Sequence, residues 1–463
     1  MLYMLALTFI LNALSARAAP VCNLRPSASS GSALASPSQP SAAGAASNPS
    51  PSSPSSNSSS DEIIAATWYA GYNSQYLAPE DISWTKYSHV TYAFGEPQPN
   101  GDISFEASNE ELIPNFVQLA HSNGVKALAT IGGWSGSAYF SSAVGSAANR
   151  TQFVKTLQQV VQQYGFDGLD FDWEYPNKQG AGCNIVNAQD TPNFLSFLQG
   201  LRQAEPNLVL SAATAIVPFN DPSGNPSADV SEFAKVLDYV ALMNYDVWGS
   251  WSDAVGPNAP LDDTCAPAAD QQGSAVSAVK AWTAAGFPAK QIVLGVAGYG
   301  HSFDVPSTTA FSVSAAVNSS VQPFGTKAIA AYPAFDKNNQ PAGDNRDVDS
   351  PPGVDSCGNS FPGGFSGIFN LAGMIQQGIL DQNGTAVAGM GFRFDSCSQT
   401  PYVYVPQNTT MISYDDPTSF AAKGKFIADQ GLGGFALWEA SSDYNDLLVD
   451  AISNAIGIDE VSC

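Results

Sequence analysis

The chain is poor in basic residues and in histidine. Its 463 residues include 17 Lys and Arg against 41 Asp and Glu, with three His, which gives a formal net charge of −24 at pH 7. A surface this acidic is repelled by nucleic-acid phosphates and by anionic lipid headgroups. The composition therefore disfavours nucleic acid and membranes as partners and suits a protein that acts on a neutral substrate.

Long apolar runs are also missing. A membrane-spanning helix needs about 20 apolar residues; the stretch from Leu2 to Leu14 is shorter, and no later stretch qualifies. It is followed by Ala16-Arg17-Ala18, a small-x-small pattern typical of a signal-peptide cleavage site. We therefore expect residues 1–19 to be a secretory signal and the protein to be secreted, in the extracellular space or the cell wall.

Aromatic residues are absent from the segment that follows. Residues 27–60 are almost wholly Ser, Ala, Pro, Gly and Asn, a composition that cannot bury enough apolar surface to fold. We predict a disordered linker over residues 20–60. Five Asn-x-Ser/Thr sequons are candidates for glycosylation in a secreted glycoprotein: Asn57, Asn149, Asn318, Asn383 and Asn408.

The six cysteines lack the spacing of a zinc site and predict disulfides in an exported protein. Cys183 and Cys265 both fall in loops beyond predicted strand ends, and we expect them to pair with each other. The same expectation pairs Cys357 with Cys397. Cys22 and Cys463, near the two chain ends, either pair with each other or have no partner within the molecule.

From about residue 61 the sequence alternates short apolar strands with amphipathic helices, which is typical of a parallel α/β fold. Eight parallel strands are the number that closes a (β/α)8 barrel, the TIM barrel. The predicted strands are 67–72, 89–94, 125–132, 168–174, 208–216, 239–246, 291–299 and 433–438. The predicted helices are 110–122, 150–164, 192–204 after the cap candidate Thr191, and 275–285 before the C-cap candidate Gly286.

The interval between the seventh and eighth strands is too long for a loop in a compact domain. We predict a small α+β insertion domain over residues 304–410, with a helix within 367–379 and a strand at 402–405. The barrel then comprises residues 61–303 and 411–463.

The fourth predicted strand ends in a cluster of acidic residues. In a β-strand, residues two apart share a face, so Asp170, Asp172 and Glu174 point the same way, while Leu169, Phe171 and Trp173 pack on the opposite face. Asp167 is out of phase and is assigned a structural role.

Like charges this close raise one another's pKa, so the cluster should keep a proton near neutral pH. A retained proton suits an acid that protonates the leaving oxygen in glycoside hydrolysis, and Glu174, nearest the end of the strand, is the candidate. A metal site or a solvated acidic turn are the alternatives. The flanking Phe, Trp and Tyr favour a cleft over a solvated turn.

Other predicted strand ends carry aromatic and polar residues, at positions 132–134, 243–246, 299–301 and 438–439. Catalytic groups of TIM barrels lie at the carboxyl ends of strands. Rings can stack on the apolar face of a sugar while polar groups bind its hydroxyls. Each aromatic alone is better explained by core packing, but their joint position at strand ends reverses that preference and predicts a sugar-binding cleft.

At these residues the chain resembles the family 18 chitinases. Their signature Asp-Gly-x-Asp-x-Asp-x-Glu is matched in full by Asp167 to Glu174. Matching motifs follow in order between about Thr67 and Tyr444: Thr-Ile-Gly-Gly-Trp at 130–134, Leu-Met-Asn-Tyr-Asp at 242–246, Ser-Tyr-Asp-Asp-Pro at 413–417 and Gly-Gly-Phe-Ala-Leu-Trp at 433–438. The long insertion resembles that of the long-cleft subgroup.

The resemblance implies a retaining mechanism in which the substrate's own N-acetyl oxygen attacks the anomeric carbon. Glu174 would protonate the leaving oxygen and then activate water. Asp172 would bind the acetamido N–H and stabilise the oxazolinium cation, Asp170 would share a proton with Asp172, and Tyr245 would donate to the acetamido carbonyl. The resemblance implies neither a cofactor nor a metal.

The resemblance also assigns substrate-binding residues. Trp438 would form the floor beside the broken bond, and Trp134 would stack on the leaving-side sugars. The remaining pocket residues implied are Met243, Asp246, Tyr69, Phe94 and Tyr299. The expected partner is chitin or its oligosaccharides, bound by a monomer.

Two positions depart from the family pattern. Thr130 stands where the family usually has Ser, which keeps the hydroxyl beside Asp170 and adds a methyl group. His301 stands where an Arg is often found after Tyr-Gly, so a permanent cation is replaced by a group that titrates. We expect activity to survive both changes, with consequences for pH dependence and sugar affinity.

The resulting hypothesis is a secreted chitinase that cleaves β-1,4 bonds between N-acetylglucosamine units. One alternative is a catalytically weak chitin-binding lectin, although inactive relatives generally lose the acid that Glu174 provides here. Another is an endo-β-N-acetylglucosaminidase acting on glycoproteins, against which the insertion argues because it deepens a cleft for long linear chains. Residues 20–60 are too short and too poor in aromatics for a separate carbohydrate-binding module.

Overall fold

The computed structural model describes residues 25–26, 63–311, 329–354 and 357–459. The predicted signal peptide, most of the predicted linker, Cys22, Cys463, Asn57 and Asn318 lie outside the described residues. Arg25–Pro26 (β1), within the range predicted as a linker, pairs antiparallel with Ile458–Asp459 (β18). Among the described residues, no helix combines the length and apolar character that crossing a bilayer requires.

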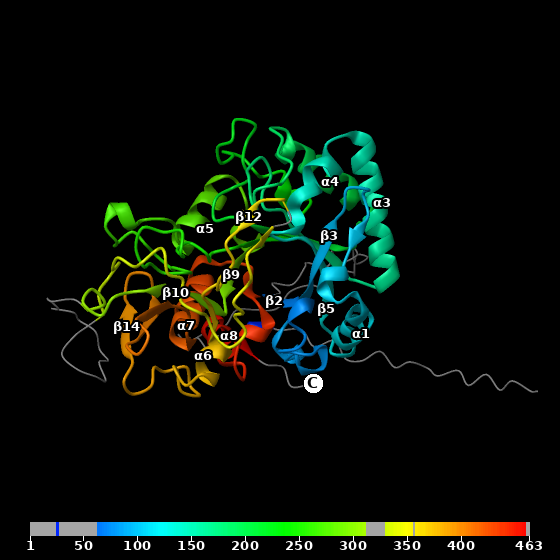
Figure 1. The fold of residues 1–463 in the computed structure, drawn as a ribbon. Helices are drawn as coiled ribbons and strands as arrows, with labels where there is room; N and C mark the ends of the chain where they lie inside the picture. The colour runs from blue at the N-terminus through cyan, green and yellow to red at the C-terminus, as the bar shows by residue number, and fades with distance from the viewer. Residues whose placement is uncertain (1–24, 27–62, 312–328, 355–356, 460–463) are drawn as a thin grey trace, which may run out of the picture.

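The described residues form a closed parallel barrel of eight strands (Figure 1), as predicted. In chain order they are β2 (Ile64–Ala70), β3 (His89–Pro97), β5 (Lys126–Gly132), β6 (Gly168–Asp172), β7 (Val209–Thr214), β8 (Tyr239–Leu242), β9 (Ile292–Ala297) and β17 (Gly434–Trp438). Pairing of β2 with both β17 and β3 closes the ring. The short β4 (Ile103–Ser104) extends β3 as an antiparallel partner.

The boundaries of the strands differ from prediction by a few residues. The largest difference is at β8, which ends at Leu242 rather than at Asp246. The chain leaves the sheet there because Asn244 donates to the Pro260 carbonyl and Asp246 takes a left-handed conformation with φ 54°. These residues therefore turn toward the end of the barrel instead of continuing the ladder.

Helices pack around the barrel (Figure 1). They are α1 (Ile113–Ser122), α2 (Phe140–Val144), α3 (Ala147–Tyr164), α4 (Asp190–Ala204), α5 (Ala275–Ala284), α7 (Pro417–Gln430) and α8 (Leu447–Ile456). Thr191 lies inside α4 and is not its cap, because the helix already begins at Asp190. Gly286 follows α5 with φ 88°, a conformation that favours glycine, and so ends that helix as predicted.

A small α+β unit is inserted between β9 and β17, as predicted. In the described part of the chain it contains a five-stranded antiparallel sheet, in the order β13 (Ile368–Asn370), β10 (Tyr299–Asp304), β16 (Thr410–Ser413), β15 (Thr400–Val405), β14 (Gly391–Asp395). It also contains the helix α6 (Leu371–Gln376) and the hairpin β11 (Gly353–Val354) and β12 (Ser360–Phe361). Figure 1 shows β14 on the side of the molecule opposite α1 and α3.

The sheet of the insertion begins at the end of the barrel strand. β9 stops at Ala297, and Tyr299 already belongs to β10, so the predicted strand 291–299 is divided between two sheets. Tyr299 and His301 are therefore placed by the insertion sheet, where His301 pairs with Ile368 on one side and Ser413 on the other.

The predicted faces of β6 are confirmed by its contacts. The Phe171 ring lies 5.9 Å from the ring of Phe194 and 5.5 Å from that of Phe197, both on α4. Asp170, one residue earlier, bonds to side chains of neighbouring strands inside the barrel. Asp167 accepts a hydrogen bond from the Ala127 N–H at 2.8 Å and has the structural role predicted for it.

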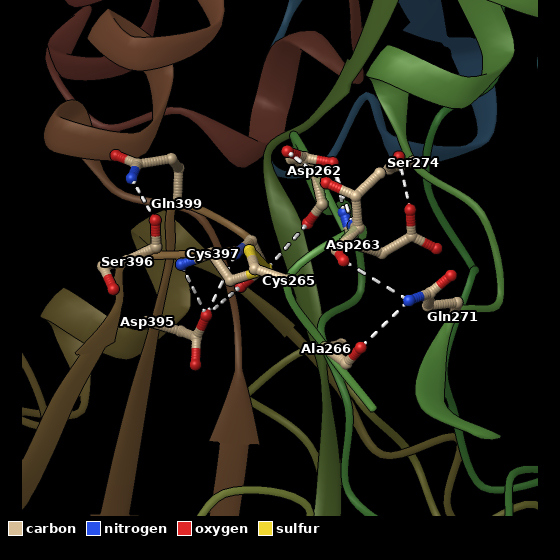
Figure 2. Close-up of a disulfide and its surroundings, with 12 residues drawn as sticks. Asp262, Asp263, Cys265, Ala266, Gln271, Ser274, Asp395, Ser396, Cys397 and Gln399 are labelled. Carbon is tan, nitrogen blue, oxygen red and sulfur yellow. Dashed lines mark hydrogen bonds between the residues drawn. A yellow bond between two sulfur atoms is a disulfide. The ribbon is translucent and has the colours of Figure 1, made fainter. Parts of the chain in front are cut away.

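The predicted disulfide pairing is wrong. Cys183 bonds to Cys357 and Cys265 bonds to Cys397, with Cα–Cα distances of 5.1 and 5.8 Å. Each bridge joins a barrel loop to the insertion instead of joining two barrel loops or two parts of the insertion. Figure 2 shows the second bridge, where Asp395 accepts from the Cys397 N–H and Asp263 holds Ser274 nearby. The cause is the folding of the insertion against the strand-end loops, which strand and helix periodicity do not reveal.

A fully buried ion pair anchors α7. The Lys423 ammonium donates to Asp415, and both side chains have no solvent exposure. Burial lowers the pKa of Lys423 and raises that of Asp415, while the attraction between them opposes both shifts. Removing one member of such a pair leaves a buried charge without compensation.

We therefore expect Lys423→Met to lower the free energy of unfolding by about 3–5 kcal/mol, measured by urea denaturation at pH 7. The control is Lys425→Met on the same helix, because Lys425 makes an exposed pair with Asp429 worth only about 0.3–0.5 kcal/mol. Equal losses in the two variants would contradict the assigned importance of the buried pair.

Candidate active site

A cleft of about 490 Å³ opens at the carboxyl ends of the barrel strands. Most of the predicted site residues line it: Asp172, Glu174, Tyr245, Trp438, Trp134, Met243, Asp246, Phe94 and Tyr299. Tyr72 and Glu96, which the sequence did not single out, line it as well. The volume is in the range of small-ligand sites, which is about 300–1,000 Å³.

Asp170 lies beneath the cleft rather than in its lining. Its carboxylate accepts hydrogen bonds from three strands: from Trp68 Nε1 at 3.0 Å, Thr130 Oγ1 at 3.2 Å and Ser211 Oγ at 2.7 Å. Burial raises the pKa of Asp170, and these three donors oppose the rise because they stabilise the charged form. The hydroxyl of Thr130 thus makes the contact expected at that position.

Asp172 lies at the cleft floor with a free acceptor atom. Its side chain is buried, and in the described structure its Oδ1 has no hydrogen-bond partner. Burial, followed by the charges of Glu174 and Asp170, raises the pKa of Asp172 well above its ordinary value. Among the described residues no hydrogen bond joins Asp170 to Asp172, so Asp170 acts on its neighbour through charge.

Glu174 lies just beyond the end of β6, which stops at Asp172. It is 9% exposed and faces the cleft. Burial raises its pKa to about 7; a hydrogen bond with Tyr175 lowers the pKa, and the charge of Asp246 raises it. Glu174 therefore keeps its proton in mildly acidic solution, as a general acid must.

The loop after β8 places Tyr245 and Asp246 in the lining of the same cleft as Glu174. Asn258, fully buried, accepts from the Asp246 N–H at 2.9 Å and donates to the Tyr299 carbonyl at 2.9 Å. Burial and the charge of Asp172 raise the pKa of Tyr245 well above its ordinary value, so its phenol stays a donor. His301 Nε2 lies 2.7 Å from Asp246 Oδ1.

Aromatic rings form the walls of the cleft. The Trp438 ring lies 5.5 Å from that of Phe94 and 5.9 Å from that of Trp68, which fixes its position between β2, β3 and β17. Trp134 and Tyr72 stand further out and are 54% and 44% exposed. Exposed rings along a polar cleft are surfaces on which sugar rings can stack.

The structure does not bring Tyr69 to the cleft. Tyr69 is buried outside the barrel wall, its ring packs 5.6 Å from Phe116 of α1, and its hydroxyl donates to the Leu77 carbonyl. Its neighbour Trp68 points inward instead and bonds Asp170. The assignment of Tyr69 to the pocket, which the family resemblance implied, is wrong because the Tyr69 side chain packs against α1. Strand alternation could not have corrected it, since both faces of β2 are buried.

Sequence reasoning also missed the supporting residues Trp68, Ser211 and Asn258. Ser211 lies on the predicted strand 208–216, three residues after its start, but a lone serine there forms no pattern. Tyr72 does carry a signal, since it ends the predicted strand 67–72 and the other aromatic residues of the cleft also lie at strand ends.

Among the described residues, no group of three or more His, Cys, Asp and Glu side chains is arranged to hold a metal ion. In the acidic cluster itself, Asp170 is saturated by protein donors. Asp172 and Glu174 face the cleft, and Asp170 does not share a ligand position with them.

Residues 66–443 match the sequence pattern of glycosyl hydrolases family 18. The chain belongs to this family. A chitinase-like effector of Moniliophthora roreri is 50% identical over 394 residues, covering 85% of this chain and 93% of the relative. Endochitinase 1 of Metarhizium robertsii is 27% identical over 408 residues, covering 82% of this chain and 81% of the relative.

A crystal structure of a chitinase from Rhizomucor miehei is 32% identical to this family 18 chain and superposes with a TM-score of 0.73, covering 84% of this chain and 99% of that one. The family therefore contains relatives of this chain that are named chitinases and others that are named chitinase-like effectors. Family membership therefore establishes the fold of this chain. Whether the chain is active depends on its own residues.

The contribution of Asp246 to the pKa of Glu174 can be measured directly. We expect Asp246→Asn to lower the pKa of Glu174 below about 7, because it removes a negative charge that favours the protonated form. His301→Arg should also lower it, since a guanidinium beside Asp246 stays charged at every pH. The measurement is carbon NMR of labelled Glu side chains during a pH titration, with Glu174→Gln identifying the signal.

Asp253→Asn is the control, because Asp253 is an exposed aspartate paired with Lys337 in the same region of the chain. This variant should leave the pKa of Glu174 unchanged. A Glu174 pKa unaffected by Asp246→Asn would show that burial and the hydrogen bond with Tyr175 set it without Asp246.

Proposed function

We propose that this protein is a secreted chitinase that cleaves β-1,4 bonds between N-acetylglucosamine units with retention of configuration. The observation that carries the proposal is the pair formed by Glu174, with its pKa of about 7, and Asp172, with a buried Oδ1 that lacks a partner in the described structure. Both face one cleft with aromatic walls. The two disulfides of the described residues suit an oxidising compartment, which supports secretion.

In the proposed reaction, Glu174 transfers its proton to the glycosidic oxygen as the bond to the anomeric carbon breaks. The carbonyl oxygen of the substrate's own acetamido group forms the new bond to that carbon, which gives a cyclic oxazolinium cation. The Glu174 carboxylate then takes a proton from water, and the water oxygen attacks the same carbon from the face that the leaving group vacated, as the bond from that carbon to the acetamido oxygen breaks and the acetamido group is restored. Two inversions at one carbon give net retention.

Asp172 and Tyr245 hold the acetamido group in this reaction. The free Oδ1 of Asp172 accepts the acetamido N–H, which fills the hydrogen bond missing in the protein alone. Tyr245 donates to the acetamido carbonyl, and its phenol remains protonated because burial raises its pKa. The charge of Asp170 beneath them favours the cationic intermediate.

A second candidate is a chitin-oligosaccharide-binding protein with little hydrolysis. The observation that favours it is the 50% identity to a relative named a chitinase-like effector. The aromatic cleft serves binding in either case. Glu174 and its raised pKa distinguish the two functions, because binding alone has no need of a general acid.

We expect Glu174→Gln to abolish nearly all hydrolysis of a chitin hexasaccharide and to retain binding of it. The amide keeps the shape of the side chain but cannot deliver the proton, and loss of a general acid costs about 10²–10⁴-fold. Product anomers followed by NMR should be initially β from the wild type. Binding by both proteins without cleavage by either would favour the second candidate, and α-anomers would contradict the retaining mechanism.

We expect Trp438→Ala to weaken oligosaccharide binding by about tenfold, measured by calorimetry, because it removes the stacking surface beside the bond to be broken. Trp438→Phe is the matched control, since it retains a ring against Phe94 and should recover most of the affinity. If Trp438→Ala bound the hexasaccharide as tightly as the wild type, Trp438 would be a core residue only.

A further inference from the structure

The main-chain carbonyl of Glu174 is enclosed by the loop that follows it. Asn184, between β6 and α4, donates its side-chain amide to this carbonyl at 2.7 Å and is buried. Gly180 lies so close to the same oxygen that a Cβ there would be 2.0 Å from it. The loop 175–189 therefore turns back and covers the peptide group that follows the acid.

The peptide group on the other side of Glu174 is also fixed. The Glu174 N–H donates to Ser137 Oγ at 2.9 Å, and Ser137 donates in turn to the Gly133 carbonyl at 2.8 Å. Ser137 is fully buried. Two side chains from different segments thus hold the main chain of Glu174, and each bonds a group that the reaction itself does not use.

Asn184 is in turn held by neighbours in its own loop and by the insertion. The Ile185 N–H donates to the Ala138 carbonyl at 3.0 Å, which ties the loop to the segment that carries Ser137. Cys183, adjacent to Asn184, is bonded to Cys357, 174 residues later in the insertion. The residue that donates to the Glu174 carbonyl is therefore next to a covalent link between its loop and the insertion.

We propose that Asn184 is a positioning residue for Glu174 and that the Cys183–Cys357 bridge lets the insertion support it. The proposal rests on the proposed function, in which Glu174 is the general acid. A misplacement of about 1 Å in a catalytic group can cost about 10²-fold in rate, and the amide of Asn184 fixes the peptide next to the acid. The closed loop also packs against the main chain of Glu174, whose side chain is only 9% exposed.

The first test compares Asn184→Ala and Asn184→Asp with the wild type. Asn184→Asp keeps the shape but presents an acceptor to the Glu174 carbonyl. In both variants we expect kcat on the hexasaccharide to fall by about 10–100-fold, with KM within about twofold. In Asn184→Ala we also expect the pKa of Glu174 to fall, because an opened loop admits water and reduces the effect of burial, so the basic limb of the pH–rate profile moves to lower pH. Asn184→Asp is compared on kcat and KM alone, because its added negative charge would itself raise the pKa of Glu174. Asn187→Ala, at an exposed position of the same loop, should change neither kcat nor the pKa of Glu174.

The second test uses the two disulfides as matched controls for each other. Cys183→Ser with Cys357→Ser and Cys265→Ser with Cys397→Ser each remove one bond between barrel and insertion, and both should lower Tm. We expect only the first pair to lower kcat and the pKa of Glu174, since Cys265 lies in the loop before α5 (Figure 2). This pair also tests the proposal if the Asn184 variants fail to fold.

The outcomes separate the inference from the proposed function. A wild type that binds but does not cleave the hexasaccharide removes the chitinase assignment, and the NMR titration of Glu174 then still reports on Asn184. An unchanged Glu174 pKa in Asn184→Ala, or an unchanged kcat of both Asn184 variants in an active enzyme, overturns the positioning role. Equal effects of the two disulfide pairs on kcat and on the Glu174 pKa overturn the role of the Cys183–Cys357 bridge.

Discussion

The burial of three carboxyl groups at the end of β6 is the constraint on which the site depends. A carboxyl group removed from water must be hydrogen-bonded, paired with a cation or protonated. Asp170 receives three donors from β2, β5 and β7. In the described structure Asp172 Oδ1 has no partner and Glu174 has a hydrogen bond with Tyr175, and burial raises the pKa of both carboxyl groups, as it does that of Asp170. The end of β6 therefore presents one carboxyl group held by three donors and, next to the cleft, two carboxyl groups with fewer donors.

The barrel and the insertion are joined at the site as well as by covalent bonds. Asn258 donates its N–H to Ser413 of β16, bonds the Tyr299 carbonyl at the start of β10, and accepts from Asp246 in the barrel loop. Through its main-chain N–H and its side-chain amide, the buried Asn258 thus connects two strands of the insertion sheet to Asp246 in the cleft lining. The wall of the cleft is part of the same hydrogen-bonded structure as its floor, which explains how an insertion more than a hundred residues after β6 in the chain contributes to the geometry around Glu174.

Much of this arrangement could be predicted from the sequence, and the limits have physical causes. The direction of Asp170 and Asp172 was predictable because charged and apolar residues alternate along β6. The direction of Trp68 and Tyr69 was not, because both faces of β2 are buried and alternation disappears. The eight strands follow from local patterns, whereas the pairing of Cys183 with Cys357 depends on how the insertion folds back. Asn184 and Asn258 belong to loops without any period, so only the three-dimensional structure reveals what they bind.

The energetic cost of the carboxyl cluster bears on the choice between an enzyme and a binding protein. Burying an acidic group whose pKa is raised destabilises the folded state as the pH rises above the ordinary pKa of that group. For Glu174 this cost grows from pH 4.5 and is complete above about 7. An amide in place of Glu174 would remove this cost and keep the shape of the cleft, so a protein that only binds oligosaccharides gains nothing from the carboxyl. The aromatic walls are common to both functions, and the acid with its supporting loop is the part of the site that hydrolysis alone requires.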